Sequence, residues 1–145
     1  MALSADKLTE YMEGVDLSIP VDDGDKIYEG AMVSVNADGY AIAAGDTAST
    51  LFVGIARENA DNSSGADGAI NVLVRRRGLF KMTLATPITI ANVGDNVYIV
   101  DDCTVDLVGN TTNDIYCGII AKYIDTTHAW VDIEPAIRQS DAAAH

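Results

Sequence analysis

Hydrophobic and polar residues alternate in short runs over most of the chain after residue 29, and Gly, Asn, Asp and Ser separate the runs. This pattern is typical of half-buried strands joined by turns. Asp38-Gly39 predicts a hairpin turn, and Gly78 predicts a bulge within one long strand. The expected strands cover 32–35, 40–43, 51–57, 70–76, 78–84, 87–90, 96–100, 104–107, 115–123 and 129–133. They predict an all-β fold, a small antiparallel barrel or sandwich.

The sequence also repeats itself at an offset of 64 residues. The clearest match places Phe-Val-Gly-Ile-Ala at 52–56 on Tyr-Cys-Gly-Ile-Ile at 116–120. Further matched pairs are Gly30 with Gly94, Val33 with Val97, Asp38 with Asp102 and Thr47 with Thr111. A repeat at a fixed offset indicates one supersecondary unit used twice. We therefore expect an internal pseudo-duplication, with units at about 30–58 and 94–122.

The N-terminal residues differ from the rest of the chain in their pattern. Residues 1–29 hold eight acidic residues and two lysines. Leu8, Tyr11 and Met12 are spaced to share one face of a short helix, which Ser4 would cap. A helix of this length is marginal in isolation, so the segment either docks on a surface or is a mobile terminus.

These patterns divide the chain into three parts. We expect an N-terminal arm at 1–29, in which 16–21 is extended, and a barrel or sandwich domain at 30–134. The residues at 135–145 are small and polar, and we expect a loose, flexible C-terminal tail there.

The composition limits the partners that the chain can have. It carries 22 acidic residues against nine Lys and Arg, for a net charge of −13. Because phosphate groups are bound through Lys and Arg, neither nucleic acid nor an anionic membrane is an expected partner. No run approaches the roughly 20 apolar residues of a membrane-spanning helix, and the N-terminus lacks the pattern of a Sec-type signal.

Residues with catalytic or metal-binding chemistry are few. His128 and His145 are the only histidines, and no Ser or Cys nucleophile motif or phosphate-binding loop accompanies them. Residues 22–25, Asp-Asp-Gly-Asp, resemble a fragment of a calcium loop but lack its closing Glu. Cys103 and Cys117 form no CxxC motif, and are either free thiols or cross-strand neighbours. We expect no enzymatic activity, cofactor or metal; a small hydrolase with scattered carboxylates is the least favoured alternative.

One basic cluster contrasts with the acidic chain. Arg75, Arg76, Arg77 and Lys81 lie within seven positions. On a strand, Arg75 and Arg77 point to one face and Arg76 to the other, which suits ion pairing better than binding along a nucleic acid. The partners are acidic groups either on another subunit or elsewhere in the same chain.

The order of these elements resembles the small capsid cement, or decoration, proteins of tailed phages. The resemblance rests on the Gly-x-x-Val-x-Val segment at 30–35 with its turn and on the segments at 52–56, 77–80, 93–98, 117–120 and 131–133, and covers roughly residues 28–134. It implies a β-rich homotrimer on the exterior of an icosahedral head, made in the host cytoplasm. There it would bind the major capsid protein and clamp neighbouring subunits. The N-terminal arm matches no motif of the family.

The function expected from this resemblance is therefore a structural one, stabilisation of the capsid. We expect contacts with the capsid, with other subunits or with neighbouring cement trimers at Leu8, Tyr11 and Met12 of the arm, and at the basic cluster; the polar loop 59–68 should be an exposed tip. A carbohydrate-binding or receptor-binding β-module displayed on the virion is the alternative. Exposed aromatic clusters would favour it, whereas Trp130 is expected in the core.

Overall fold

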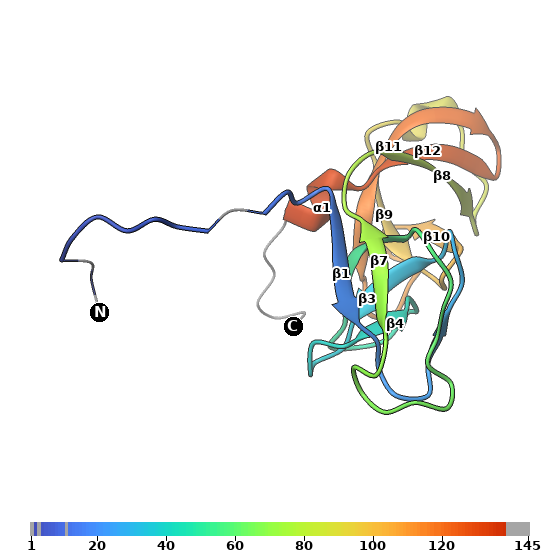
Figure 1. The fold of residues 1–145 in the computed structure, drawn as a ribbon. Coiled ribbons are helices and arrows are strands. Elements are labelled where there is room, and N and C mark those ends of the chain that lie inside the picture. Colours follow the sequence, from blue (N-terminus) through green and yellow to red (C-terminus); the bar gives the residue numbers. More distant parts are fainter. Residues whose placement is uncertain (1, 3, 11, 139–145) are drawn as a thin grey trace.

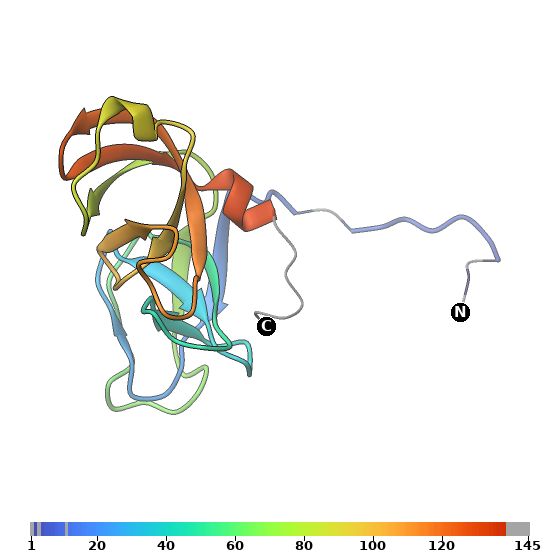
Figure 2. The same ribbon diagram turned by 180° about the vertical axis from the view of Figure 1, so that it is seen from behind.

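The computed structural model describes residues 2, 4–10 and 12–138, so Tyr11 of the predicted arm contact lies outside the described residues. The fold is mostly β, which confirms the all-β class (Figures 1 and 2). Its strands form two five-stranded units, with a small additional pair, β2 (Lys26–Ile27) and β6 (Ala60–Asp61).

The first unit is a five-stranded sheet with the order β1-β7-β5-β3-β4. The strands are β1 (Asp16–Pro20), β3 (Met32–Val35), β4 (Ala41–Ala43), β5 (Leu51–Ala56) and β7 (Asn71–Arg75). All neighbours in it are antiparallel. A parallel bridge between Val21 and Ala41 joins its two edges, so the sheet curls towards a barrel.

The second unit is a closed barrel with the order β10-β8-β12-β11-β9. The strands are β8 (Leu79–Leu84), β9 (Asn96–Ile99), β10 (Thr104–Leu107), β11 (Tyr116–Asp125) and β12 (His128–Asp132). A parallel pairing of β10 with β8 closes it, whereas the remaining neighbours are antiparallel.

The two units repeat each other strand by strand. In each, a central strand (β3 or β9) pairs with the next two strands of its own repeat. Matching hydrogen bonds run from Gly30 N to Ala56 O and from Gly94 N to Ile120 O, at 2.9 and 2.8 Å. The closing contacts also match: the Val21–Ala41 bridge corresponds to the pairing of Leu84 with Val105. The repeat therefore includes β1 with β8 and β7 with β12, beyond the segments matched in the sequence.

The two units share hydrophobic contacts. Ile19, Val33 and Val72 belong to a core inside the first unit. Phe52 and Ile55 also lie on a first-unit strand, but they pack into the core cluster of the closed barrel. Burial of the first unit's side chains among those of the second joins the repeats into one body.

Several expected elements differ from the observed ones. Gly78 is not a bulge in one long strand, because β7 belongs to the first sheet and β8 to the barrel. The expected strand at 87–90 is absent, and a short 3-10 helix at Ile90–Asn92, capped by the Thr89 hydroxyl, follows it instead. The loop at 59–68 is mostly exposed, but it contains β6 and the buried Asn62, whose side-chain amide donates to the carbonyls of Val21, Asp22 and Ala66.

The two terminal segments that lie outside the folded domain are shorter than the sequence predicted. The sheets begin at Asp16, so the segment that stands apart from them ends at residue 15 rather than 29. At the other end, α1 (Glu134–Arg138) packs Ala136 and Ile137 against the barrel core, so residues 135–138 are not a loose tail. Residues 139–145 lie outside the description. In the described part of the chain no helix is long and apolar enough to cross a membrane.

A carboxylate links the loops of the two repeats. Asp46 accepts hydrogen bonds from the backbone N–H groups of Thr112 and Asn113, both at 2.8 Å, and the Asn113 amide donates to Asp46 O. Partial burial raises the pKa of Asp46, but these hydrogen bonds outweigh it, and the pKa lies below its ordinary value. A lowered folded-state pKa stabilises the fold above the unfolded value of about 3.9, and this stabilisation is lost as the pH falls through the folded value.

We therefore expect Asp46→Ala to lower the free energy of unfolding by about 1–3 kcal/mol at neutral pH, because it leaves two backbone donors without this acceptor. The difference from the wild type should shrink below about pH 4, as urea unfolding at a series of pH values would measure. Asp6→Ala in the exposed arm is the control and should change neither value. A difference that stays constant into strong acid would contradict the assignment.

Candidate interaction surface

The N-terminal arm stands away from both units (Figures 1 and 2). Residues 5–10 and 12–15 form no helix, in contrast to the short helix expected there. The side chains of Leu8 and Met12 are 95% and 74% exposed. A helix this short is marginal in isolation, because its entropy cost is offset only when it packs against a surface. Two large apolar side chains are thus presented to solvent on an extended segment.

The base of the arm is fixed at the junction of β1 and β7. The backbone N–H of Arg76 donates to Val15 O at 2.8 Å, and its guanidinium donates to Gly14 O at 3.3 Å. The Asp16 carboxylate accepts from Arg57 and Arg75, at 2.8 and 3.2 Å. Partial burial raises the pKa of Asp16, but the two guanidinium groups outweigh it and the pKa lies below its usual value. The direction in which the arm leaves the sheet is therefore set by paired groups.

The four residues of the predicted basic cluster separate into different environments. Arg75 is paired with Asp16 in the same chain, and Arg77 with Glu134 at 2.8 Å. Hydrogen bonds from Arg77 and Arg138 hold the pKa of Glu134 below its ordinary value. No carboxylate among the described residues lies within ion-pairing distance of Arg76 or Lys81. Within one chain, internal pairing thus accounts for two of the four.

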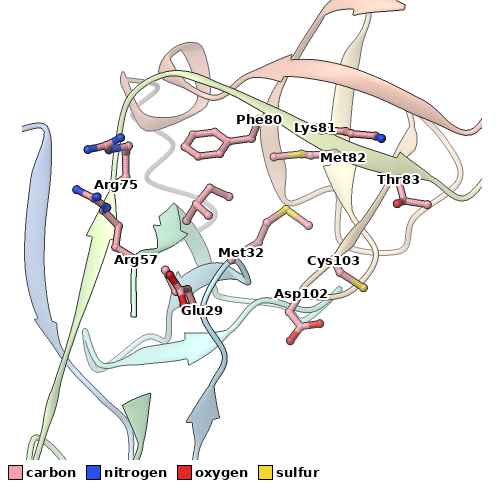
Figure 3. Close-up of a pocket in the computed structure, with 13 residues that line it drawn as sticks. Glu29, Met32, Arg57, Arg75, Phe80, Lys81, Met82, Thr83, Asp102 and Cys103 are labelled. Carbon is pink, nitrogen blue, oxygen red and sulfur yellow. The ribbon is translucent and has the colours of Figure 1, made fainter. Parts of the chain in front are cut away.

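A groove of about 490 Å³ lies between the two units (Figure 3). Apolar side chains from both repeats line it: Met32, Ile55, Phe80 and Met82. Arg57, Arg75 and Glu29 lie towards one end, while Lys81, Asp102 and Cys103 lie towards the other. Pockets that bind small molecules have roughly this size, about 300–1,000 Å³, but few charged groups line them. Five charged residues line this groove: Glu29, Arg57, Arg75, Lys81 and Asp102.

A second, polar hollow of about 440 Å³ lies at the base of the arm. Arg76, Arg77 and Arg138 line it, together with Glu13 and Glu134. The groove and this hollow together contain six of the nine basic residues of the chain: Arg57, Arg75, Arg76, Arg77, Lys81 and Arg138. On a chain with a net charge of −13, positive charge thus gathers beside the arm and the seam between the repeats.

The arm was predictable from the sequence, but the groove was not. The groove combines residues from β3, β5, β7 and β8, which become neighbours only when the two repeats pack together. The one signal available was the density of basic residues at 75–81.

Trp130 lies on the outer side of the barrel and is 38% exposed, so the expectation of a core position was wrong. It is paired across strands with Lys81 of β8 and Lys122 of β11. Its neighbours at alternate positions of β12, Ala129 and Val131, are buried. The side-chain alternation of the strand therefore places the indole outside.

The candidate catalytic groups do not converge on one another: His128 begins β12, Cys103 precedes β10 and Cys117 lies within β11. His128 Nδ1 lies 2.9 Å from Asp125 Oδ1, across the turn that joins β11 to β12. Cys103 is exposed and Cys117 is buried, and both are free thiols. Burial raises the pKa of the Cys117 thiol strongly, so it is not a reactive nucleophile.

Two groups of acidic side chains also come together, Asp22 with Asp23 and Asp67, and Asp101 with Asp102 and Cys103. Burial, followed by the hydrogen bond and charge of Asp67, raises the pKa of Asp22. Burial and the repulsion of neighbouring carboxylates both disfavour the ionised form of Asp22, and burial is the larger of the two.

Comparisons of the chain with protein-family models, with curated proteins and with solved structures found no match.

Proposed function

We propose that this chain is a structural virion protein, a trimeric decoration protein that binds the outside of a phage head and stabilises contacts between major capsid protein subunits. The observation that carries the proposal is the extended arm, which presents Leu8 and Met12 to solvent beside a body made of a curled sheet and a closed barrel. In this role the protein needs no reaction centre and performs no enzymatic step.

The arm supports this role because exposed apolar side chains gain free energy only when a surface covers them. Full burial of a Leu or Met side chain is worth about 1.5–3 kcal/mol. One arm therefore binds weakly, but three arms on a trimer bind together and gain avidity. A protein that binds only the assembled lattice stabilises that lattice by mass action.

The charge distribution supports ion-pair contacts with other subunits or with the capsid, in addition to the apolar contacts of the arm. Arg76 and Lys81 have no carboxylate partner among the described residues and remain available to acidic groups of another subunit or of the capsid. The remaining surface is acidic, which limits non-specific adhesion to nucleic acid.

The alternative is a carbohydrate-binding or receptor-binding module displayed on the virion. One observation favours it: the exposed Trp130 between Lys81 and Lys122 presents an aromatic face with two flanking cations. Trp130 is the only tryptophan, so its fluorescence reports directly on this face. A change in that fluorescence on adding a glycan, removed by Lys122→Ala, would favour the alternative.

The molar mass in solution tests the proposal. We expect light scattering to give about three times 15.3 kDa at micromolar concentration. Arg76→Glu together with Lys81→Glu should weaken the trimer, more strongly at low salt, because exposed charges are screened beyond about 10 Å at 0.1 M ionic strength. A strict monomer at all concentrations, without binding to undecorated heads, would contradict the proposal.

A further inference from the structure

We propose that the outer face of β9 and β11 in the closed barrel is covered by β1 of a second copy of this chain. On this face lie Asn96, Tyr98, Tyr116 and Ile119, with Val108 beside them. Copies associate through this contact, and only the number of copies that close a ring rests on the proposed function. The evidence comes from the two repeats, which carry the same face in two different environments.

The face has a counterpart on β3 and β5 of the first unit. Each counterpart residue lies 64 positions earlier in the chain. The strand registers agree, since the pairs Asn96–Ile119 and Tyr98–Tyr116 occupy the places of Met32–Ile55 and Ser34–Phe52. The two faces are therefore equivalent in backbone position.

The counterpart face is covered within the chain itself. Met32, Phe52 and Ile55 are only 2%, 2% and 7% exposed. Elements of the closed barrel and the helix after it cover them: Met82 of β8 and Ala136 of α1 belong to the same core cluster. Met82 also lies beside Met32 in the groove between the units, and α1 contacts β5 (Figure 3). In this protein, a face of this kind is thus buried by the neighbouring unit.

On the closed barrel the same face is open. Tyr98, Tyr116 and Ile119 are only half-buried. Val108 is 72% exposed, whereas its counterpart Ala44 is 5% exposed. A hollow of about 340 Å³ lies beside Tyr98 and Val108, and the two tyrosine rings pack with their centroids 5.9 Å apart. Tyrosines are enriched in the buried centres of protein interfaces, because they combine a large apolar area with one polar group.

The carboxylates near this face already have partners in the same chain. Of the residues described at the hollow, only Asp95 is charged, and it accepts a hydrogen bond from the Asn92 side chain. Asp106, opposite Tyr98 on β10, is buried and accepts from the Thr86 hydroxyl. A partner therefore needs apolar surface rather than a matching charge.

The internal repeat indicates which surface of a second copy fits. β1 is the equivalent of β8, because the pairing of Asp16 with Arg75 corresponds to that of Leu79 with Asp132. As β8 lies on the β3–β5 face, β1 of a second copy lies on the β9–β11 face. The chain's own β1 is fixed to β7 along its whole length. Such a contact joins two different surfaces, and contacts of this type close into rings. Three copies, with two units each, place six units in one ring.

Two cysteine variants test the contact. Both carry Cys103→Ser, which leaves the buried Cys117 as the only natural thiol. One adds Asn96→Cys on the face and the other Ser18→Cys on β1, and both positions are exposed. Mixed with oxidised glutathione as the oxidant, they should give a disulfide-linked species of twice 15.3 kDa on non-reducing gels. The matched control replaces Ser18→Cys by Ser64→Cys, an exposed loop position, and should cross-link much less.

A charge placed on the face tests its part in association. Val108→Glu puts a carboxylate into the apolar contact, so the concentration at which light scattering shows half-association should rise by about tenfold or more. Val108 is exposed in the single chain, so urea unfolding should remain that of the wild type. Tyr28→Glu is the control, since it also replaces a large exposed side chain, in the first unit, and should leave association unchanged.

The outcomes separate this contact from the wider proposal. Cross-links in the Asn96→Cys protein alone, equal to those in the mixture, would show that the face meets itself and overturn the pairing with β1. Unchanged association of Val108→Glu and no mixed cross-links, in a protein that is still trimeric, would overturn the contact and leave the decoration function standing. Absence of any self-association would overturn both.

Discussion

Replacement of Gly118 by alanine is expected to lower the free energy of unfolding by about 3–5 kcal/mol, through a steric clash and backbone strain in the middle of β11. Gly118 has φ of 158° and faces β12 closely. A Cβ atom there would lie 2.5 Å from Asp132 O and 2.6 Å from Val131 Cγ1. One of the two obstacles is backbone, so the strands themselves would have to separate.

Gly109→Ala is the control for this experiment. Gly109 also has a positive φ, 85°, but a Cβ there would meet no atom within 4 Å. It should therefore cost only about 1–2 kcal/mol, the conformational penalty alone. Urea unfolding followed by the fluorescence of Trp130 on β12 measures both variants. Equal losses for the two would show that the close approach of β12 does not restrict position 118.

The same constraint occurs at the equivalent position of the first repeat. Gly54 has φ of 145°, and a Cβ there would clash with the carbonyl oxygen of Arg75 on β7. Both glycines also lie at register shifts of their strands. Both glycines belong to an aromatic-x-Gly-Ile motif, at 52–55 and 116–119. At each glycine the neighbouring strand lies so close that there is no room for a side chain.

The repeat was predictable for β3, β4 and β5 and for β9, β10 and β11, because these strands are related by a constant offset of 64 residues. The strands that flank them are not related by this offset. Asp16–Pro20 corresponds to 79–83 of β8, and Asn71–Arg75 to His128–Asp132, at offsets that differ from 64. The pairing of Asp16 with Arg75 becomes that of Leu79 with Asp132, so an ion pair in one repeat has no counterpart in the other. The flanking strands therefore differ between the repeats both in their spacing and in their side chains. A comparison of the sequence with itself at an offset of 64 residues does not detect them.

The interaction surface was predictable only in part. Regular spacing of apolar residues in the arm predicted a contact segment, and its exposure in the structure fits that role. The same spacing also predicted a helix, which does not form without a surface to pack against. The groove could not be foreseen, because its lining depends on which faces of the two repeats meet.

Removal of residues 1–20 is expected to lower the free energy of unfolding by about 4–6 kcal/mol, much of the roughly 5–15 kcal/mol of a typical domain. The deletion removes β1, which pairs along its whole length with β7. Ile19 is lost from the first core, Leu17 from its margin, and Asp16 from its two arginines. Lost burial and unpaired edge groups on β7 account for the loss.

The shorter deletion of residues 1–13 separates attachment from folding. It spares Gly14 and Val15, which are hydrogen-bonded to Arg76, and leaves β1 intact. We expect its urea unfolding to match that of the full chain within about 0.5 kcal/mol, since it removes only exposed side chains. Co-sedimentation with undecorated phage heads should nevertheless show loss of attachment. If this variant still bound heads like the full chain, the arm would have no part in assembly; if it unfolded as readily as the longer deletion, the arm would belong to the fold.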